Sequence, residues 1–341
     1  MRRGMRISRR RRLAVLGAVL VWLVAGRVLE TRRLAVALPR STPGSIQARL
    51  DAARMHADLV QLASGPFQGR APETPGSAMA ARLVADRYAE LGLRRFGASY
   101  EQPFSFEHTS IRALWQSNRP FRQTFTTTRN IVGYVAGTMS PDDVIVVSAH
   151  FDHLGVIDGE MYPGADDNAS GVSALLATAA YLAAHPPAHT VVFAAFDAEE
   201  MGLRGAQVFV AALPFPRERL RLNINVDMIG RSDDGRLFVS GVRATPALRP
   251  MVEVAARTAT VPVHIGHDRP MLLTGLIADW TPLSDHGAFH DAGVPFLYFG
   301  VEDHADVHQP TDTADRIDAA FHAASAEMVL STLLEADATR W

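Results

Sequence analysis

Four short, nearly continuous runs of apolar residues stand out in the body of the chain. They are residues 143–149 (DVIVVSA), 190–196 (TVVFAAF), 220–226 (LRLNINV) and 294–300 (VPFLYFG). A strand that helices cover on both faces is apolar at nearly every position, whereas a half-exposed strand alternates between apolar and polar residues. The four runs therefore predict buried strands of a mainly parallel sheet.

Helical periodicity occupies the stretches between and around these strands. The predicted helices lie at residues 45–65, 77–93, 171–185, 244–259 and 318–336. Strands that alternate with helices are joined by right-handed crossovers, which place helices on the sheet faces. Residues 99–136, rich in Phe, Thr and Tyr, predict antiparallel strands at one edge. We expect an α/β fold of three layers: a mainly parallel central sheet with helices on both faces and antiparallel edge strands.

The amino-terminal segment has the pattern of a secretory leader. Seven arginines precede residues 13–26 (LAVLGAVLVWLVAG), an uncharged and largely apolar run of fourteen. Such a run after a basic region is typical of a signal peptide, while a membrane-spanning helix usually needs about 20 apolar residues. We interpret residues 1–33 as a signal peptide or signal anchor, with residues 13–29 as the segment that would anchor the chain. Residues 34–341 would form one domain, exported to the periplasm or the extracellular space, because basic flanks stay on the cytoplasmic side.

Composition narrows the chemistry of the body. The chain has no cysteine, which excludes disulfides, thiolate nucleophiles and Cys-ligated zinc or iron–sulfur clusters. Residues 1–33 hold ten arginines and one acid, so the remaining chain carries 24 arginines against 35 acids. This excess of acids argues against nucleic acid as a partner. Every basic residue is arginine, which also excludes lysine Schiff-base chemistry.

Polar side chains follow each predicted parallel strand near the point where it ends. In chain order they are His150 and Asp152, Glu199 and Glu200, Asp227, and, eight residues after the last strand, His308. The carboxyl ends of parallel strands meet at one edge of a sheet, where such folds bind ligands. Asp166 and Asp167 add carboxylates from the loop before a predicted helix. Each residue alone has an ordinary explanation as a turn or helix start, but together they are typical of a zinc or manganese site.

Six motifs in a fixed order carry a resemblance to a known family. They are SAHFDHLG, GADDNASG, FDAEEMGLRGA, NVDMIGR, SDHGAFHDAGVPFLYF and HADVHQPTDT. Over residues 50–337 the chain resembles the dizinc exopeptidases of metallopeptidase family 28, the group of the bacterial leucyl aminopeptidases. The resemblance implies a zinc-peptidase catalytic domain at residues 34–341. It also implies an aminopeptidase that removes N-terminal residues from peptides with a free N-terminus.

The resemblance further implies a role for each site residue. The site would hold two zinc ions, which manganese or cobalt could replace. His150 and Asp227 would bind one ion, Glu200 and His308 would bind the other, and Asp167 would bridge both. Glu199 would be the general acid/base that acts with a metal-bridging hydroxide. Asp152 would not bind the metal but would orient the His150 ring. A cis peptide bond between Asp167 and Asn168 is also expected.

Two further groups of residues lie near these motifs. Ser284-Asp285-His286 has Ser and His only two apart and lacks the strand–G-x-S-x-G turn of a serine hydrolase. The resemblance instead places Asp285 and His286 at the pocket wall as substrate-binding residues, with a helix cap as the alternative. His153, Asp303 and His304 stand close to the implied ligands, where we expect them to neutralise charge or cap rather than bind metal.

The same scaffold also supports functions other than that of an aminopeptidase. Related glutaminyl cyclases work with one zinc ion, so the complete five-residue ligand set counts against that activity. A carboxypeptidase would need a cationic anchor for the terminal carboxylate, such as Arg204 or Arg231. A non-catalytic, receptor-like relative would have lost ligands or the base, whereas this chain keeps all of them.

Overall fold

The structure is a computed structural model, which describes residues 35–39, 48–109, 122–268 and 279–340. The predicted leader, including its apolar segment at residues 13–29, lies outside the described residues. Among the residues that are described, no helix combines the length and the apolar composition needed to cross a bilayer.

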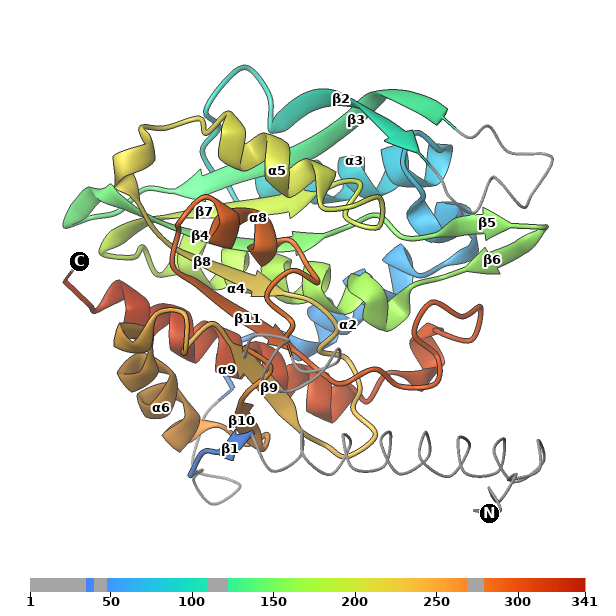
Figure 1. Ribbon diagram of the computed structural model, residues 1–341. Helices are drawn as coiled ribbons and strands as arrows, with labels where there is room; N and C mark the ends of the chain where they lie inside the picture. The colour runs from blue at the N-terminus through green and yellow to red at the C-terminus, as the bar shows by residue number, and fades with distance from the viewer. Residues whose placement is uncertain (1–34, 40–47, 110–121, 269–278, 341) are drawn as a thin grey trace, which may run out of the picture.

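A sheet of nine strands runs through the centre of the described structure (Figure 1). Its strands, in the order in which they lie side by side, are β1 (Val36–Ala37), β10 (Val263–Ile265), β9 (Leu237–Ser240), β11 (Phe296–Gly300), β8 (Leu220–Val226), β4 (Ser140–His150), β7 (His189–Phe196), β3 (Arg122–Val135) and β2 (Glu101–Thr109). β4 is parallel to both of its neighbours, β7 and β8, and β8 is also parallel to β11. The parallel centre confirms the prediction made from the four apolar runs.

Both edges of the sheet contain antiparallel pairs. β3 is antiparallel to β7, and β2 is antiparallel to β3, as expected for residues 99–136. At the other edge, β9 is antiparallel to β11 and β1 is antiparallel to β10. A separate hairpin of two strands, β5 (Gly155–Ile157) and β6 (Glu160–Tyr162), follows the end of β4.

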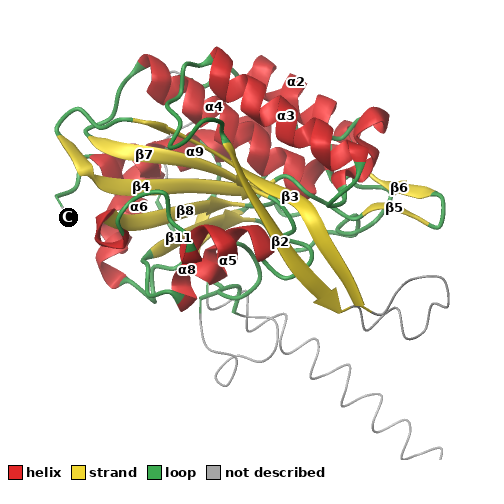
Figure 2. Ribbon diagram, turned by 90° about the horizontal axis from the view of Figure 1, so that it is seen from above, coloured by secondary structure: helices red, strands yellow, loops and turns green. Residues whose placement is uncertain are grey.

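Helices cover both faces of this sheet and complete the three layers. They are α2 (Ala52–Leu62), α3 (Pro75–Glu90), α4 (Gly171–Ala184), α5 (Arg204–Ala211), α6 (Arg249–Thr258), α8 (His286–Asp291) and α9 (Ala319–Asp337). Figure 2 shows α2, α3 and α4 on one face and α5 with α8 on the other. α6 and α9 share the larger apolar core with α2, α3 and α4, while α5 and α8 close a smaller core. Every residue of β7 and of β11 is buried between these layers.

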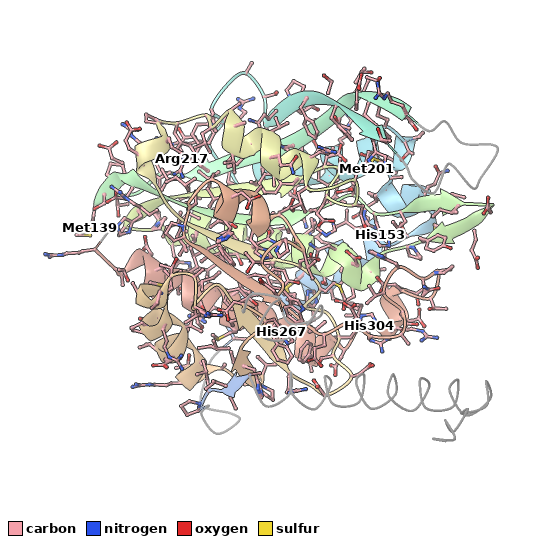
Figure 3. All side chains as sticks on the ribbon, viewed as in Figure 1. Met139, His153, Met201, Arg217, His267 and His304 are labelled. Carbon is pink, nitrogen blue, oxygen red and sulfur yellow. The ribbon has the colours of Figure 1, made fainter. Side chains whose placement is uncertain are left out.

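The carboxyl ends of the parallel strands β4, β7 and β8 point toward the same side of the molecule. In Figure 3, Met139 and Arg217, which come just before β4 and β8, lie at the left. His153 and Met201, which follow β4 and β7, lie at the right. The residues that follow the parallel strands therefore share one edge of the sheet, as the sequence predicts.

One buried histidine of the core makes folding stability depend on pH. Burial lowers the pKa of His322, on α9, to about 4, although its hydrogen bond to the Ser170 carbonyl opposes this shift. Between pH 4 and 6.5 the unfolded chain therefore binds more protons at this ring, so stability falls on acidification by up to about 1.4 kcal/mol per pH unit. We expect His322→Gln to flatten the plot of unfolding free energy against pH in this range. His185→Gln, at an exposed position, should keep the parent slope; an equal slope in His322→Gln would refute the prediction.

Candidate metal centre and active site

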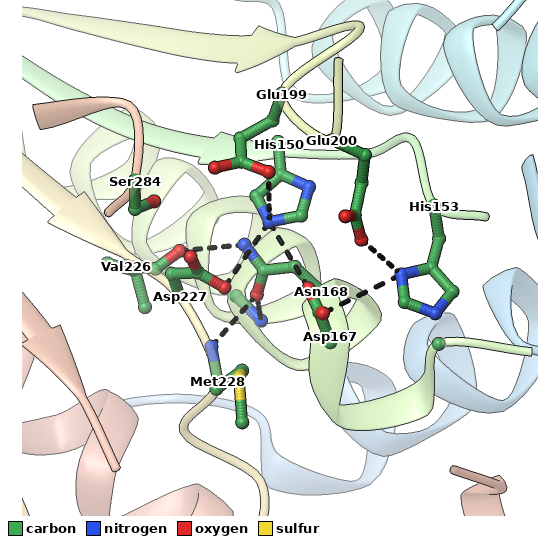
Figure 4. A network of polar contacts seen from close by, with 12 residues as sticks. His150, His153, Asp167, Asn168, Glu199, Glu200, Val226, Asp227, Met228 and Ser284 are labelled. Atoms are coloured by element: carbon green, nitrogen blue, oxygen red, sulfur yellow. Dashed lines mark hydrogen bonds and ion pairs between the residues drawn. The ribbon is translucent and has the colours of Figure 1, made fainter. Parts of the chain in front are cut away.

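Three segments converge on His150, the last residue of β4. Its Nε2 lies 3.3 Å from Oδ1 of Asp227, which follows β8. The same atom lies 3.4 Å from Oδ1 of Asp167, on the loop that leads into α4. The three side chains are buried, and their donor atoms lie within 4.8 Å of one another (Figure 4). They form one group that could hold a cation.

A second group shares Asp167 and lies beside the first. Nε2 of His308 is 3.1 Å from Oδ2 of Asp167 and 3.3 Å from Oε2 of Glu200. Nδ1 of His153 is 2.7 Å from the other Glu200 oxygen, Oε1, and 3.7 Å from Oδ2 of Asp167. The ligand atoms of His153, Asp167 and Glu200 also lie within 4.8 Å of one another. Asp167 therefore offers one carboxylate oxygen to each group.

The loop that presents Asp167 is held from behind by another carboxylate. Asp312 accepts hydrogen bonds from the backbone N–H groups of Asp166 and Asp167. Asp166 turns away from the groups, accepting from the N–H of Gly230 at 2.6 Å and contacting Nε2 of His304 at 2.9 Å. The peptide bond between Asp167 and Asn168 is cis, as expected from the resemblance.

Asp152 contacts both His150 and the backbone of the Glu pair. His150 Nδ1 donates to the backbone carbonyl of Asp152 at 3.2 Å, and the Asp152 carboxylate is 3.7 Å away. That carboxylate accepts instead from the backbone N–H groups of Glu199 at 3.0 Å and Glu200 at 3.3 Å. The proton on Nδ1 leaves His150 Nε2 as a lone-pair donor toward a cation. Asp152 thus fixes both the tautomer of His150 and the backbone of the Glu pair.

Left-handed backbone conformations flank the site residues. Ala198, directly before Glu199, has φ of 60°, and Met228, directly after Asp227, has φ of 57°. His308 itself has φ of 55°. Such conformations cost about 1–3 kcal/mol each for residues other than glycine and tend to persist at functional sites, where the surroundings enforce them.

Glu199 lies next to the groups without belonging to either. Its Oε2 is 4.0 Å from Nε2 of His150. Burial, together with the charges of Glu200, Asp285 and Asp227, raises the pKa of Glu199 well above its usual value, while His150 opposes the rise. A buried carboxylate that holds a proton more readily than an exposed one suits general acid/base work.

The residues of the two groups fit zinc. Imidazole and carboxylate donors without thiolate are a common zinc ligand set. Most distances between neighbouring donor atoms, from 3.1 to 3.7 Å, match the edge of about 3.3 Å expected for a tetrahedron around zinc. The hydrogen bonds of His308 to Asp167 and Glu200 raise its pKa to about 11. These carboxylates therefore favour a positive charge at this position, which a dication satisfies.

The groups open into a cavity of about 440 Å³. Carboxylates line one part of it, including those of Glu199 and Asp303, and apolar side chains line the rest. The apolar lining residues are Leu203, Met228, Trp280, Pro282, Leu283, Val301 and Val307. A cavity of this size and lining accommodates an apolar side chain of a ligand next to the two groups of donor residues.

Asp285 and His286 lie behind the cavity and do not line it. Both are fully buried, and His286 Nε2 donates to the carbonyl of Trp280 at 2.9 Å. Burial raises the pKa of Asp285 to about 8, and neither of its carboxylate oxygens has a hydrogen-bond partner among the described residues. Substrate contact by these two residues stays a prediction. Ser284 is also buried and accepts a hydrogen bond from Asn225 at 2.9 Å.

Arg70 is a supporting residue that the sequence did not reveal. It is fully buried and is the last residue of a 3-10 helix, η1 (Gly65–Arg70), which precedes α3. Its guanidinium donates to four backbone carbonyls, those of Leu62, Phe151, Pro163 and Gly164, at 2.7–2.8 Å. These contacts tie α2 to the segment after β4 and to the segment before Asp167. A single arginine at the end of a short 3-10 helix carries no periodicity or spacing that would single it out.

We expect Arg70→Met to destabilise the fold by about 3 kcal/mol or more, because four buried carbonyls lose their donor. Chemical denaturation measures this loss. Arg82→Met is the matched control, since Arg82 is 84% exposed and its contact with Asp86 spans 3.8 Å; it should change stability by less than about 0.5 kcal/mol. Equal stabilities of the two variants would show that Arg70 does not hold these segments.

Comparison with known proteins places this arrangement in a family. The family model described as Peptidase family M28 matches residues 130–333. The aminopeptidase YwaD of Bacillus subtilis is 30% identical over 223 residues, which cover 62% of this chain and 46% of the relative. The chain thus spans less than half the length of that relative.

Two solved structures share the fold. A zinc aminopeptidase from Bacillus subtilis, BSAP, superposes with a TM-score of 0.63 at 18% identity, over 85% of this chain and 96% of that one. A glutaminyl cyclase from Porphyromonas gingivalis has the same TM-score at 17% identity, over 84% of this chain and 99% of its own. At these identities the likeness shows the fold alone. The family match, which covers more than half of the sequence, shows that the chain belongs to peptidase family M28.

Proposed function

We propose that this protein is a dizinc aminopeptidase. One observation carries the proposal: two groups of imidazole and carboxylate donors share the single carboxylate of Asp167 and open into one cavity. The proposed ligands are His150 and Asp227 for one zinc ion, Glu200 and His308 for the other, and Asp167 for both. When bound, a pair of such cations would polarise the scissile carbonyl and make a water molecule more acidic.

Glu199 would carry the protons in this reaction. Its carboxylate lines the cavity beside the two groups and is anchored through its backbone by Asp152. It would accept a proton from the attacking water and donate it to the nitrogen of the departing amine. Its raised pKa brings the two protonation states closer in energy, which both transfers require.

The cavity lining supports a peptide with a free, positively charged N-terminus as substrate. Asp303 is an exposed carboxylate in the lining, and no cationic side chain other than His308 lines the cavity among the described residues. An α-ammonium group would therefore be attracted, and a C-terminal carboxylate would be repelled. Leu283 and Val301 would contact the side chain of the first residue.

Paired peptide assays test this function. The zinc-loaded full chain should hydrolyse aminoacyl fluorogenic substrates, lose this activity with a chelator and recover it with zinc. N-acetylated versions of the same substrates should not be cleaved. Conversion of N-terminal glutamine to pyroglutamate would identify a cyclase, and cleavage of N-blocked peptides from the C-terminus a carboxypeptidase. Inertness toward all of these substrates would contradict an enzymatic role.

We also propose that the protein is exported, as a periplasmic or extracellular enzyme. The arginines ahead of the apolar residues 13–26 support this proposal. Cell fractionation followed by N-terminal sequencing distinguishes a cleaved signal peptide from a retained anchor. Recovery of the intact chain from the cytosol alone would refute export.

A further inference from the structure

His153 occupies a position that the five proposed ligands do not explain. It follows His150 by three residues on the loop after β4, and its side chain is buried. In Figure 4 its ring faces Glu200 and Asp167 from the side opposite His150. The ring of His308 approaches the same two carboxylates, with its centroid 5.8 Å from that of His153. Two imidazoles therefore converge on one pair of carboxylates.

The contact between His153 and Glu200 is close but is not a hydrogen bond. Nδ1 and Oε1 are 2.7 Å apart. Both atoms are buried and have no hydrogen-bond partner among the described residues, because the in-plane direction of Nδ1 does not point at the oxygen. With the ring proton on Nε2, Nδ1 and Oε1 are two buried electron-pair donors 2.7 Å apart, which is costly unless something positive lies between them. A cation near both atoms would satisfy them together.

The backbone holds the His153 ring in this position. A Cβ atom at Gly164 would lie 2.6 Å from two carbon atoms of the ring, so only glycine leaves room for the imidazole there. Gly164 is in turn fixed by the hydrogen bond from Arg70 to its carbonyl at 2.8 Å. The ring is therefore packed in place toward Glu200 and Asp167 and is not a freely rotating neighbour.

We propose that His153 binds, through Nδ1, the cation that Asp167, Glu200 and His308 hold. This proposal rests on the proposed function, because it adds a ligand to one of its two zinc ions. The two centres would then differ: one would have a single imidazole, His150, and the other would have two, His153 and His308. The centre with two imidazoles would hold zinc more tightly and discriminate more strongly against Mg²⁺, which prefers oxygen ligands.

The competing explanation is that His153 only positions Glu200. In that case Nδ1 would donate a hydrogen bond to Oε1 and never touch the metal. Loss of such a partner also weakens metal binding, typically by about 10- to 100-fold. An affinity measurement alone therefore does not separate the two roles, and the distance between metal and nitrogen must be measured.

A crystal structure of the zinc-loaded full chain makes that measurement. The proposal predicts zinc about 2.0–2.1 Å from Nδ1 of His153. A distance beyond about 3 Å, with Nδ1 hydrogen-bonded to Glu200, would overturn it and establish the positioning role.

Zinc titration of variants supplies the solution test. His153→Gln should weaken one of the two binding steps by about 10-fold or more while leaving the other unchanged. His322→Gln is the matched control, because His322 is equally buried but hydrogen-bonds to the Ser170 carbonyl outside both groups; it should bind zinc as the parent does. Two unchanged binding steps in His153→Gln would refute only this inference, whereas a parent chain that binds no zinc would refute the proposed function as well.

Discussion

Replacement of Glu199 by glutamine is expected to abolish most hydrolysis while leaving the metal content unchanged. The amide matches the carboxylate in size but cannot accept the proton of the attacking water. Because Glu199 lies outside both donor groups, the variant should retain the parent amount of zinc. General acid/base catalysis contributes about 100- to 10,000-fold, which sets the expected fall in kcat. Initial rates on an aminoacyl substrate, together with elemental analysis of the same sample, measure both quantities.

The control for this variant is another Glu→Gln change. Glu160 is exposed at the start of β6 and belongs to neither donor group, so Glu160→Gln should keep both the rate and the zinc. If Glu199→Gln hydrolysed the substrate at the parent rate, Glu199 would not be the base. If it lost zinc as well as activity, Glu199 would serve the metal and not the proton transfer.

Replacement of Asp167 by asparagine is expected to affect both metal centres at once. Asp167 presents Oδ1 to His150 and Oδ2 to His308. An amide has one good acceptor oxygen, so it cannot serve two cations. It also removes the negative charge that both cations need. We expect the zinc content to fall by at least one ion per chain, and the rate to fall by more than about 1,000-fold.

A second carboxylate from the same cavity provides the comparison. Asp303 lines the cavity but belongs to neither donor group, so Asp303→Asn should keep the parent zinc content. Circular dichroism of Asp167→Asn should match that of the parent, since its backbone N–H remains available to Asp312. Full zinc content in Asp167→Asn would contradict a shared bridging carboxylate.

The sequence predicted the central strands because their burial leaves a simple signal. Helices on both faces require apolar residues at nearly every position, and β7 and β11 are buried throughout. β9 and β10 were not predicted, because strands of four and three residues are too short to show a periodic pattern of hydrophobic and polar residues. The helix expected at residues 45–65 begins only at Ala52, where the side chain of Asp51 caps it by accepting from the N–H of Arg54.

The sequence predicts those site residues that come directly after the ends of the parallel strands. Residues after parallel strands must meet at one edge, so the grouping of His150 with Asp227 follows from topology. The contacts that support these residues do not follow from topology. Asp312 reaches the site from a loop and Arg70 from the end of a short 3-10 helix, and the course of both segments depends on tertiary packing. The side chain of Asp152 lies 3.7 Å from Nδ1 of His150, near the place expected for it, and it also accepts from the backbone of Glu199, a contact that depends on the exact turn after β7.

Zinc stoichiometry of the purified full chain measures whether two cations share the carboxylate of Asp167. The protein is loaded with zinc, freed of unbound metal by gel filtration and analysed for zinc per chain. We expect two zinc ions per chain, one for each donor group that shares Asp167. A chain that retains no zinc under these conditions, or that binds one ion with Asp167→Asn unaffected, would contradict this expectation.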